Sequence, residues 1–227
     1  MIPLKAERPV RTTPWVNIFL IAANIAVFFF FNVAQPRLAA SLPFQVGFVP
    51  YPLFHIAEGS PQTALAAVVS LGTAMFLHGG WLHLLGNMLY LFIFGDNVEE
   101  VLGHRRYLAF YLLCGTAAAL THGAFHPDST TPVVGASGAV AGVLGAYLLF
   151  FPATRVKTLL FFGIFAHITA LPAAVLLGIW ALFQVLSAVG ASAGKTAFIA
   201  WYAHVGGFAA GLLTAPLFRW LRTRRRS

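Results

Sequence analysis

The hydrophobic pattern of the chain consists of long apolar runs separated by short polar stretches. A bilayer core of about 30 Å takes roughly 20 apolar residues to cross as a helix, so runs of this kind indicate membrane spans. The pattern predicts six helical spans, at residues 15–34, 81–94, 107–122, 137–151, 172–187 and 198–218. We therefore predict an all-α fold, a polytopic bundle of six transmembrane helices.

Two further apolar segments are predicted not to cross the membrane. TALAAVVSLGTAMFLH lies in a long proline-containing connection, residues 35–79, where we expect an interfacial or partly dipping segment. TLLFFGIFAHITA is too short to cross and is stopped by Pro172, so we place it at the interface. The expected organisation is an N-terminal cytoplasmic segment 1–14, one membrane domain 15–218 and a basic cytoplasmic tail 219–227, with no repeat or second domain.

The composition supports this class of protein. Of the 227 residues, 59% are hydrophobic and 9% are charged, and the mean hydropathy is +0.81. A soluble domain carries about 25% charged residues, so the chain has too little polar surface to be one. The first residues do not resemble a cleavable signal, and we expect the first span to be retained. Cys114 is the single cysteine, which excludes an intramolecular disulfide.

The net charge of +8 comes from short basic clusters between the apolar runs. Such clusters are typical of topology signals rather than of a nucleic-acid-binding face. With six spans, 12 of the 14 basic residues fall on one side of the membrane: Lys5, Arg8, Arg11, Arg105, Arg106, Arg155, Lys157, Arg219, Arg222, Arg224, Arg225 and Arg226. Arg37 and Lys195 fall on the other side, so both termini are predicted to be cytoplasmic.

Four polar residues within the predicted spans stand out: His83, Asn87, Ser137 and His204. His83 and Asn87 are four residues apart and share one helix face. Each alone is explained by a hydrogen bond between helices, worth around 0.6 kcal/mol. All four, however, fall at a similar depth on three helices, and polar groups inside a membrane indicate a functional site.

The residue types suggest a serine hydrolase. A serine hydroxyl becomes a strong nucleophile when a neutral imidazole takes its proton, which suits Ser137 and His204. Asn87, His83 and the backbone N–H groups beside Ser137 are candidate donors to an oxyanion. The chain's carboxylates, Glu7, Glu58, Asp96, Glu99, Glu100 and Asp128, are all predicted in loops or at span ends. We therefore expect a Ser–His dyad, oriented by helix packing rather than by an aspartate.

Small residues surround both members of this dyad. Gly138 and Gly142 follow Ser137, and Gly207 and Gly211 follow His204, in each pair four residues apart. Small residues at this spacing let helix backbones approach closely. We expect the fourth and sixth spans to pack in this way and so to bring hydroxyl and imidazole together.

Three motifs then resemble one family. GASGA around Ser137, HLLGN from His83 to Asn87 and AHVGGFAAG around His204 are similar, in order and spacing, to the motifs of the rhomboid intramembrane serine proteases. The likeness covers residues 15–218. It implies Ser137 as nucleophile, His204 as general base, and His83, Asn87 and the Ser137 N–H as oxyanion donors. It also implies cleavage of transmembrane protein substrates through an acyl-enzyme, without metal or cofactor and without nucleic acid.

The resemblance carries expectations for location and for other residues. It implies a multi-pass protein of a plasma or bacterial inner membrane, with the site open towards the outer side. Glu99 is expected to be a structural hydrogen-bond acceptor, and His78 to face the water-filled entrance or to lie solvated in a loop. The Trp-Arg pair of many members is missing from residues 35–79. Ala141 replaces a tyrosine that packs under the catalytic ring in some members, so the imidazole must be supported differently.

Two other functions remain as alternatives, a metal-binding protein and a non-catalytic relative of the family. His122 and His126 have the spacing of helical metal ligands, but there is no His-Glu-x-x-His motif and Pro127 places His126 in a loop. A non-catalytic relative that binds membrane helices is disfavoured because both Ser137 and His204 are present. As the mobile element that admits substrate we consider the loop 188–197 and the fifth span.

Overall fold

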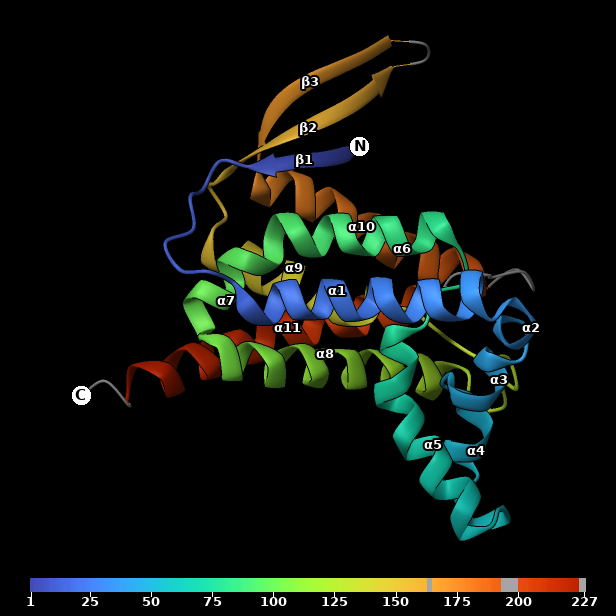
Figure 1. Cartoon of the computed structure of the whole chain (residues 1–227). Coiled ribbons are helices and arrows are strands. Elements are labelled where there is room, and N and C mark those ends of the chain that lie inside the picture. The colour runs from blue at the N-terminus through green and yellow to red at the C-terminus, as the bar shows by residue number, and fades with distance from the viewer. Residues whose placement is uncertain (163–164, 193–199, 225–227) are drawn as a thin grey trace.

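The computed structural model describes residues 1–162, 165–192 and 200–224, and its main body is a bundle of helices (Figure 1). Six helices run along a common direction: α1 (Trp15–Phe29), α6 (Trp81–Tyr90), α8 (His104–Phe125), α9 (Ser137–Phe150), α10 (Ala173–Ser192) and α11 (Trp201–Thr223). Each corresponds to one of the six predicted spans. The predicted start of the sixth span, residue 198, lies outside the described residues, and α11 extends past the predicted end of that span at residue 218.

Two of these helices continue into a short π-helical turn. α1 is followed by η1 (Phe30–Ala34), and α6 by η4 (Leu91–Gly95) and α7 (Asp96–Leu102). The sequence GDNVEEVLG, at the polar break between the second and third predicted spans, therefore contains a helix. Glu99 on α7 is buried and accepts hydrogen bonds from the backbone N–H groups of Val16 and Asn17, at 3.0 and 2.7 Å. These are orphan donors at the start of α1, so Glu99 is the structural acceptor that was expected.

The membrane-spanning capacity of the helices varies. In the described part of the chain, three are long and apolar enough to cross: Trp15–Ala34, His104–Phe125 and Ala173–Gly190. A fourth candidate is the pair Pro61–Phe76 and Trp81–Leu102, which is bent by 80°. α9 has only 14 residues. The six-span count and the side on which the termini lie therefore stay predictions.

The short helix α9 forms the centre of the bundle. Its residues from Gly138 to Tyr147 are all buried, as expected for a helix that is apolar on every side. Glycines make this burial possible: a Cβ added to Gly211 would lie 2.7 Å from the Cα of Gly142 and nearer still to its carbonyl oxygen. Towards α8, a Cβ on Gly138 would lie 2.5 Å from the Cβ of Ala118. α9 is thus packed between α8 and α11, backbone close to backbone.

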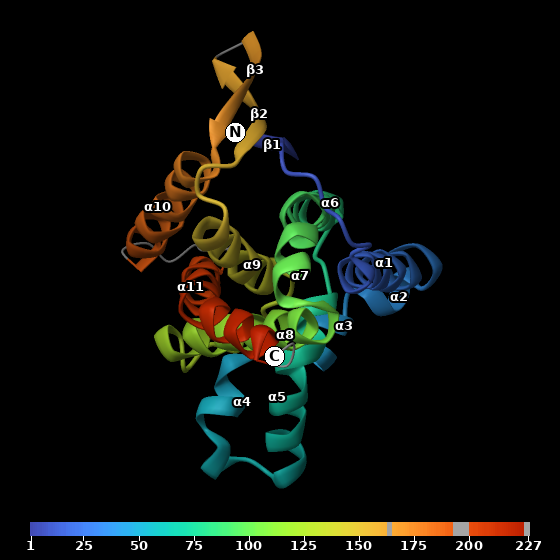
Figure 2. The same cartoon turned by 90° about the vertical axis from the view of Figure 1, so that its left-hand side faces the viewer.

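The fold is not all-α, because three strands form an antiparallel sheet in the order β1 (Ile2–Ala6), β2 (Arg155–Phe162) and β3 (Phe165–Pro172). β2 pairs with β3 from Arg155 opposite Pro172 to Phe162 opposite Phe165. The sheet projects from the bundle near the start of α10 (Figures 1 and 2). The all-α prediction is wrong here because a short apolar run has no period that separates strand from buried helix. The β-branched and aromatic residues of TLLFFGIFAHITA favour the strand.

The long connection 35–79 consists of short helices. They are α2 (Pro36–Ala39), α3 (Leu42–Val46), α4 (Pro50–Phe54), the 3₁₀ turn η2 (Ile56–Glu58), α5 (Pro61–Thr73) and the 3₁₀ turn η3 (Ala74–Phe76). Prolines stand in the first turn of all four α-helices, where a missing N–H costs no hydrogen bond. α4 and α5 project from the bundle on the side away from the sheet (Figure 1). α5 is the segment predicted to dip or to lie at the interface.

Candidate active site

The stretch VVGASGAV turns the chain from an extended segment into α9. Val133 pairs with Phe48 of the long connection through two backbone hydrogen bonds, of 2.7 and 3.0 Å. Gly135 then adopts a φ of +129°, which side chains rarely allow, and its N–H donates to the Ala74 carbonyl. A Cβ at Gly135 would also lie 2.6 Å from the His83 ring. Glycine is therefore required here by both conformation and space, and Ser137 becomes the first residue of the helix.

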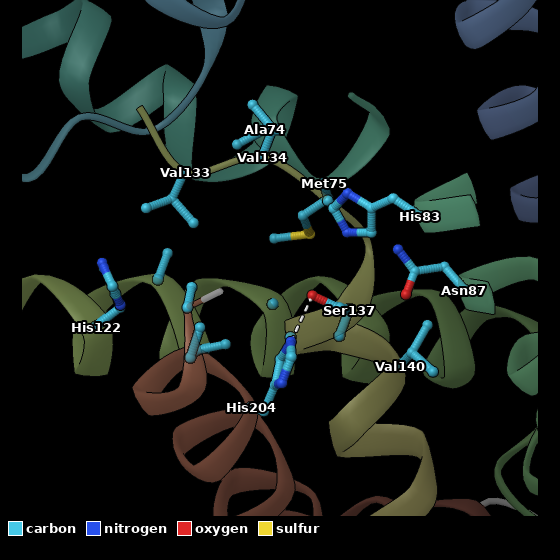
Figure 3. Close-up of a pocket in the computed structure, with 18 of the residues that line it drawn as sticks. Ala74, Met75, His83, Asn87, His122, Val133, Val134, Ser137, Val140 and His204 are labelled. Atoms are coloured by element: carbon cyan, nitrogen blue, oxygen red, sulfur yellow. Dashed lines mark hydrogen bonds between the residues drawn. The ribbon is translucent and has the colours of Figure 1, made fainter. Parts of the chain in front are cut away.

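The structure brings Ser137 and His204 together. The Nε2 atom of His204, on the first turn of α11, lies 2.9 Å from the Oγ atom of Ser137 (Figure 3). Both side chains are half-buried, so neither is sealed from a substrate. The two residues are 67 positions apart in the sequence, so local structure does not bring them together. The close approach of α9 and α11 at their glycines sets the distance between them.

A third side chain, which the sequence analysis missed, contacts His204 from α10. The Oε1 atom of Gln184 lies 2.7 Å from the Nδ1 atom of His204. Gln184 is 5% exposed and is the one amide side chain in the sequence of α10. A single amide in an apolar span was the sequence feature that could have indicated this contact, since a polar residue within an apolar span is costly unless it has a partner.

Two tryptophans flank the imidazole. The ring of Trp180, one turn before Gln184, lies 6.2 Å from that of His204, and the ring of Trp201 lies 6.1 Å away in an edge-on arrangement. Ala141, where some rhomboids have a tyrosine, is completely buried within α9. The histidine is thus supported from α10 and from its own helix rather than from the helix that carries the serine.

His83 and Asn87 lie one turn apart on α6 and face the Ser137 hydroxyl from the side opposite His204, in the view of Figure 3. The Asn87 side-chain amide lies 3.0 Å from Nε2 of His78. His78 is buried and its ring packs edge-on to that of His83, with centroids 5.1 Å apart. The expectation of a solvated loop position for His78 is therefore wrong, because the residue supports the two α6 side chains.

Ser137, His204, Gln184, His83 and Asn87 line one cavity of about 1680 Å³. It is lined by α6, by residues 131–135, by the start of α9 and by Trp180, Gln184 and His204, and its walls are mainly apolar. None of the described residues that line it is an Asp, Glu, Lys or Arg. A protonated histidine or an oxyanion would therefore be stabilised by neutral dipoles and not by an ion pair.

His122 and His126 line the same cavity, with ring centroids 4.8 Å apart. Within residues 1–162, 165–192 and 200–224, no group of three or more His, Cys, Asp or Glu side chains could hold a metal ion. His122 and His126 together provide two ring donors.

Comparison with known proteins identifies the fold family. The sequence model described as the Rhomboid domain matches residues 66–221. The chain belongs to the rhomboid family. This rhomboid is 30% identical to RHOMBOID-like protein 1 of Arabidopsis thaliana over 224 residues, which cover 90% of this chain and 53% of the relative. It is 38% identical to the Rhomboid protease GluP of Bacillus subtilis (strain 168) over 96 residues, or 41% of this chain and 18% of GluP.

A third relative, RHOMBOID-like protein 5 of Arabidopsis thaliana, is 38% identical over 76 residues, which cover 34% of this chain and 25% of the relative. The chain thus spans about a quarter to a half of the length of these Arabidopsis relatives. The matched Rhomboid domain includes the site residues on α6, α9, α10 and α11.

Proposed function

We propose that this rhomboid is an intramembrane serine endopeptidase that cleaves transmembrane segments of other membrane proteins. The observation that carries the proposal is the 2.9 Å contact between Ser137 Oγ and His204 Nε2 inside a large cavity of the Rhomboid domain. A cavity of this size is larger than the usual small-ligand pocket of about 300–1,000 Å³. It offers room for an extended peptide.

The proposed reaction follows from the positions of the side chains. The Ser137 hydroxyl donates its proton to Nε2 of His204 while Oγ attacks the carbonyl carbon of the scissile peptide bond. The resulting tetrahedral oxyanion receives hydrogen bonds from the Asn87 amide, the His83 ring and the Ser137 N–H. His204 then gives the proton to the leaving amine as the C–N bond breaks, which leaves an acyl-enzyme.

Hydrolysis of the acyl-enzyme repeats these steps with water. His204 takes a proton from the water, the hydroxide adds to the ester carbonyl, and the C–O bond to Ser137 breaks as the proton returns to Oγ. No metal or cofactor takes part in either half of the proposed reaction.

The shortness of α9 supports a site below the membrane surface. Fourteen residues at about 1.5 Å each make a helix of about 21 Å, shorter than a bilayer core of about 30 Å. With the end of α9 at one face of the membrane, its N-terminal Ser137 lies several ångströms below the other face. The open cavity around Ser137 then provides the path for water that hydrolysis needs.

The placement of the basic residues supports an outward-facing site. Arg8 lies 3.6 Å from Glu100 on α7, and Arg106 donates to the Leu221 carbonyl near the end of α11. Basic residues from the N-terminal segment, α8 and α11 thus gather at one end of the bundle, away from Ser137. By the positive-inside rule this end is cytoplasmic, in a plasma or bacterial inner membrane, and the site opens to the outer side.

The experiment that tests the proposal is cleavage of a reporter transmembrane substrate by the purified full chain in lipid vesicles. Replacing Ser137 with alanine is expected to abolish cleavage, as is replacing His204. The matched control is Ser70→Ala on α5, because the Ser70 hydroxyl is buried but donates only within its own helix, to the Ala67 carbonyl. Unchanged cleavage by the Ser137 variant would refute the proposal, and loss of wild-type cleavage on adding a chelator would favour a metal enzyme.

A further inference from the structure

Gln184 is a buried polar group whose position demands an explanation. It lies on α10, a helix at the rim of the bundle (Figure 2), and its neighbours in sequence are Phe183 and Val185. Transfer of an unpaired amide into an apolar environment costs several kcal/mol. Gln184 avoids that cost through its contact of 2.7 Å with His204 Nδ1.

The two contacts of His204 together define one protonation pattern. A neutral imidazole carries a proton on one nitrogen and a lone pair on the other. To accept the Ser137 proton, Nε2 must carry the lone pair, so the proton resides on Nδ1. That N–H then donates to Oε1 of Gln184, an oxygen that can only accept. The chain of hydrogen bonds runs from serine to histidine to glutamine with every donor matched to an acceptor.

We propose that Gln184 is the positioning residue that completes the Ser137–His204 pair, in the role that an aspartate has in a serine protease triad. The inference rests on the proposed function. The amide oxygen holds the tautomer and the ring orientation that base catalysis needs, as the asparagine does in papain-like Cys-His-Asn sites. The expectation that packing alone orients the imidazole is thereby replaced by a specific hydrogen bond.

A neutral amide suits this environment better than a carboxylate. The titratable side chains that line the cavity with His204 are His83 and Tyr90 on α6, His122 and His126 from α8 and its end, and Tyr202 on α11. The described lining has no Lys or Arg to pair with an acid. A buried carboxylate without such a partner is costly, whereas the amide dipole still favours a positive charge on the ring.

The first test measures the tautomer directly and does not depend on activity. Nitrogen NMR of ¹⁵N-histidine-labelled full chain in detergent micelles, with the His204 signals assigned by their loss in His204→Gln, is expected to show a protonated Nδ1 and an unprotonated Nε2 at neutral pH. In Gln184→Leu, which keeps the approximate size but removes the acceptor, the two tautomers are expected to mix. A wild-type His204 protonated on Nε2, or an unchanged tautomer in Gln184→Leu, would overturn the inference.

The second test measures the rate at which a fluorophosphonate probe labels Ser137. Gln184→Leu is expected to lower this rate about tenfold, since one hydrogen bond of about 1–1.5 kcal/mol is lost. Gln184→Glu is expected to restore the rate at alkaline pH and to shift the midpoint of the pH profile upward by about one unit, because a carboxylate beside Nδ1 stabilises the imidazolium. The control is Leu177→Ala, a buried position on the same helix outside the cavity, which is expected to lower thermal stability without shifting the midpoint.

The outcomes separate the two proposals. Equal labelling of wild type and Gln184→Leu, or a Gln184→Glu profile with an unshifted midpoint, would overturn the role of Gln184 and leave the protease proposal standing. Wild-type protein that is not labelled would contradict the protease proposal, and the tautomer measurement would then still decide the hydrogen-bond role of Gln184.

Discussion

The close contact between α9 and α11 makes Gly211 a sensitive position far from the reacting atoms. A Cβ added there would lie 2.7 Å from the Cα of Gly142, and ordinary contact begins at 3.4 Å. Because the obstacle is backbone, the helices must separate by at least 0.7 Å. A rigid separation of that size along the line from Ser137 Oγ to His204 Nε2 lengthens this distance from 2.9 Å to 3.6 Å, which is no longer a hydrogen bond.

The expected consequence of Gly211→Ala is a loss of activity that exceeds the loss of stability. Overpacking of this kind costs about 1–3 kcal/mol, so the protein stays folded at moderate temperature. Misplacement of reacting groups by about 1 Å costs on the order of 10²-fold in rate. Cleavage of a reporter transmembrane substrate in vesicles is therefore expected to fall about 100-fold, with a lower thermal midpoint in detergent.

The matched control is Gly178→Ala on α10, where an added Cβ meets nothing within 4 Å. The same chemical change is expected to leave cleavage within about twofold there and to raise stability by up to about 1 kcal/mol through helix propensity. Wild-type cleavage and melting in Gly211→Ala would refute the claim that backbone contact between α9 and α11 sets the catalytic distance.

Three further predictions concern the surroundings of the site. Asn87→Ala is expected to lower kcat by about 10²–10³-fold with little change in KM, because the proposed mechanism has the amide donate to the oxyanion. Equal effects on both constants in cleavage kinetics would argue against that role. Gly135→Ala is expected to cost about 1–3 kcal/mol of strain and to displace His83. The expected result is lower thermal stability together with slower probe labelling of Ser137, and wild-type values for both would contradict the strained geometry. Glu99→Gln is expected to lower the thermal midpoint, because it caps the start of α1 more weakly, while the fluorophosphonate probe labels the folded fraction at the wild-type rate. Loss of labelling without loss of stability would place Glu99 in the catalytic machinery instead.

The apolar pattern located the helices of the bundle because each contains a continuous apolar run, and because the polar breaks between the runs are clear. It did not predict the strands of residues 155–172, because the apolar run within them has no period that separates a strand from a short helix. In the structure β2 pairs with β3 as a hairpin along the whole of both strands. β1, about 150 residues earlier in the chain, adds the third strand. α7 was missed for a related reason: the polar residues that suggest a turn are buried, with Asn97 and Glu99 each 1% exposed.

The candidate site was predictable where chemistry-bearing residues stand alone in apolar spans. Ser137, His204, His83 and Asn87 were selected on that ground, and the structure places all four around one cavity. Gln184 satisfies the same criterion, but an amide in a helix has several uses and its partner lies 20 residues away on another helix. His78 was misjudged because its burial depends on how the break between α5 and α6 folds back onto Asn87.

The measurement that tests the central claim most directly is covalent labelling of the wild-type chain by a fluorophosphonate probe, followed by mass-spectrometric mapping of the modified residue. Because the Ser137 hydroxyl lies 2.9 Å from Nε2 of His204, the proposed pair predicts an adduct on Ser137 that disappears in His204→Ala. An adduct on another serine, or one on Ser137 that forms equally fast without His204, would contradict the proposed catalytic pair.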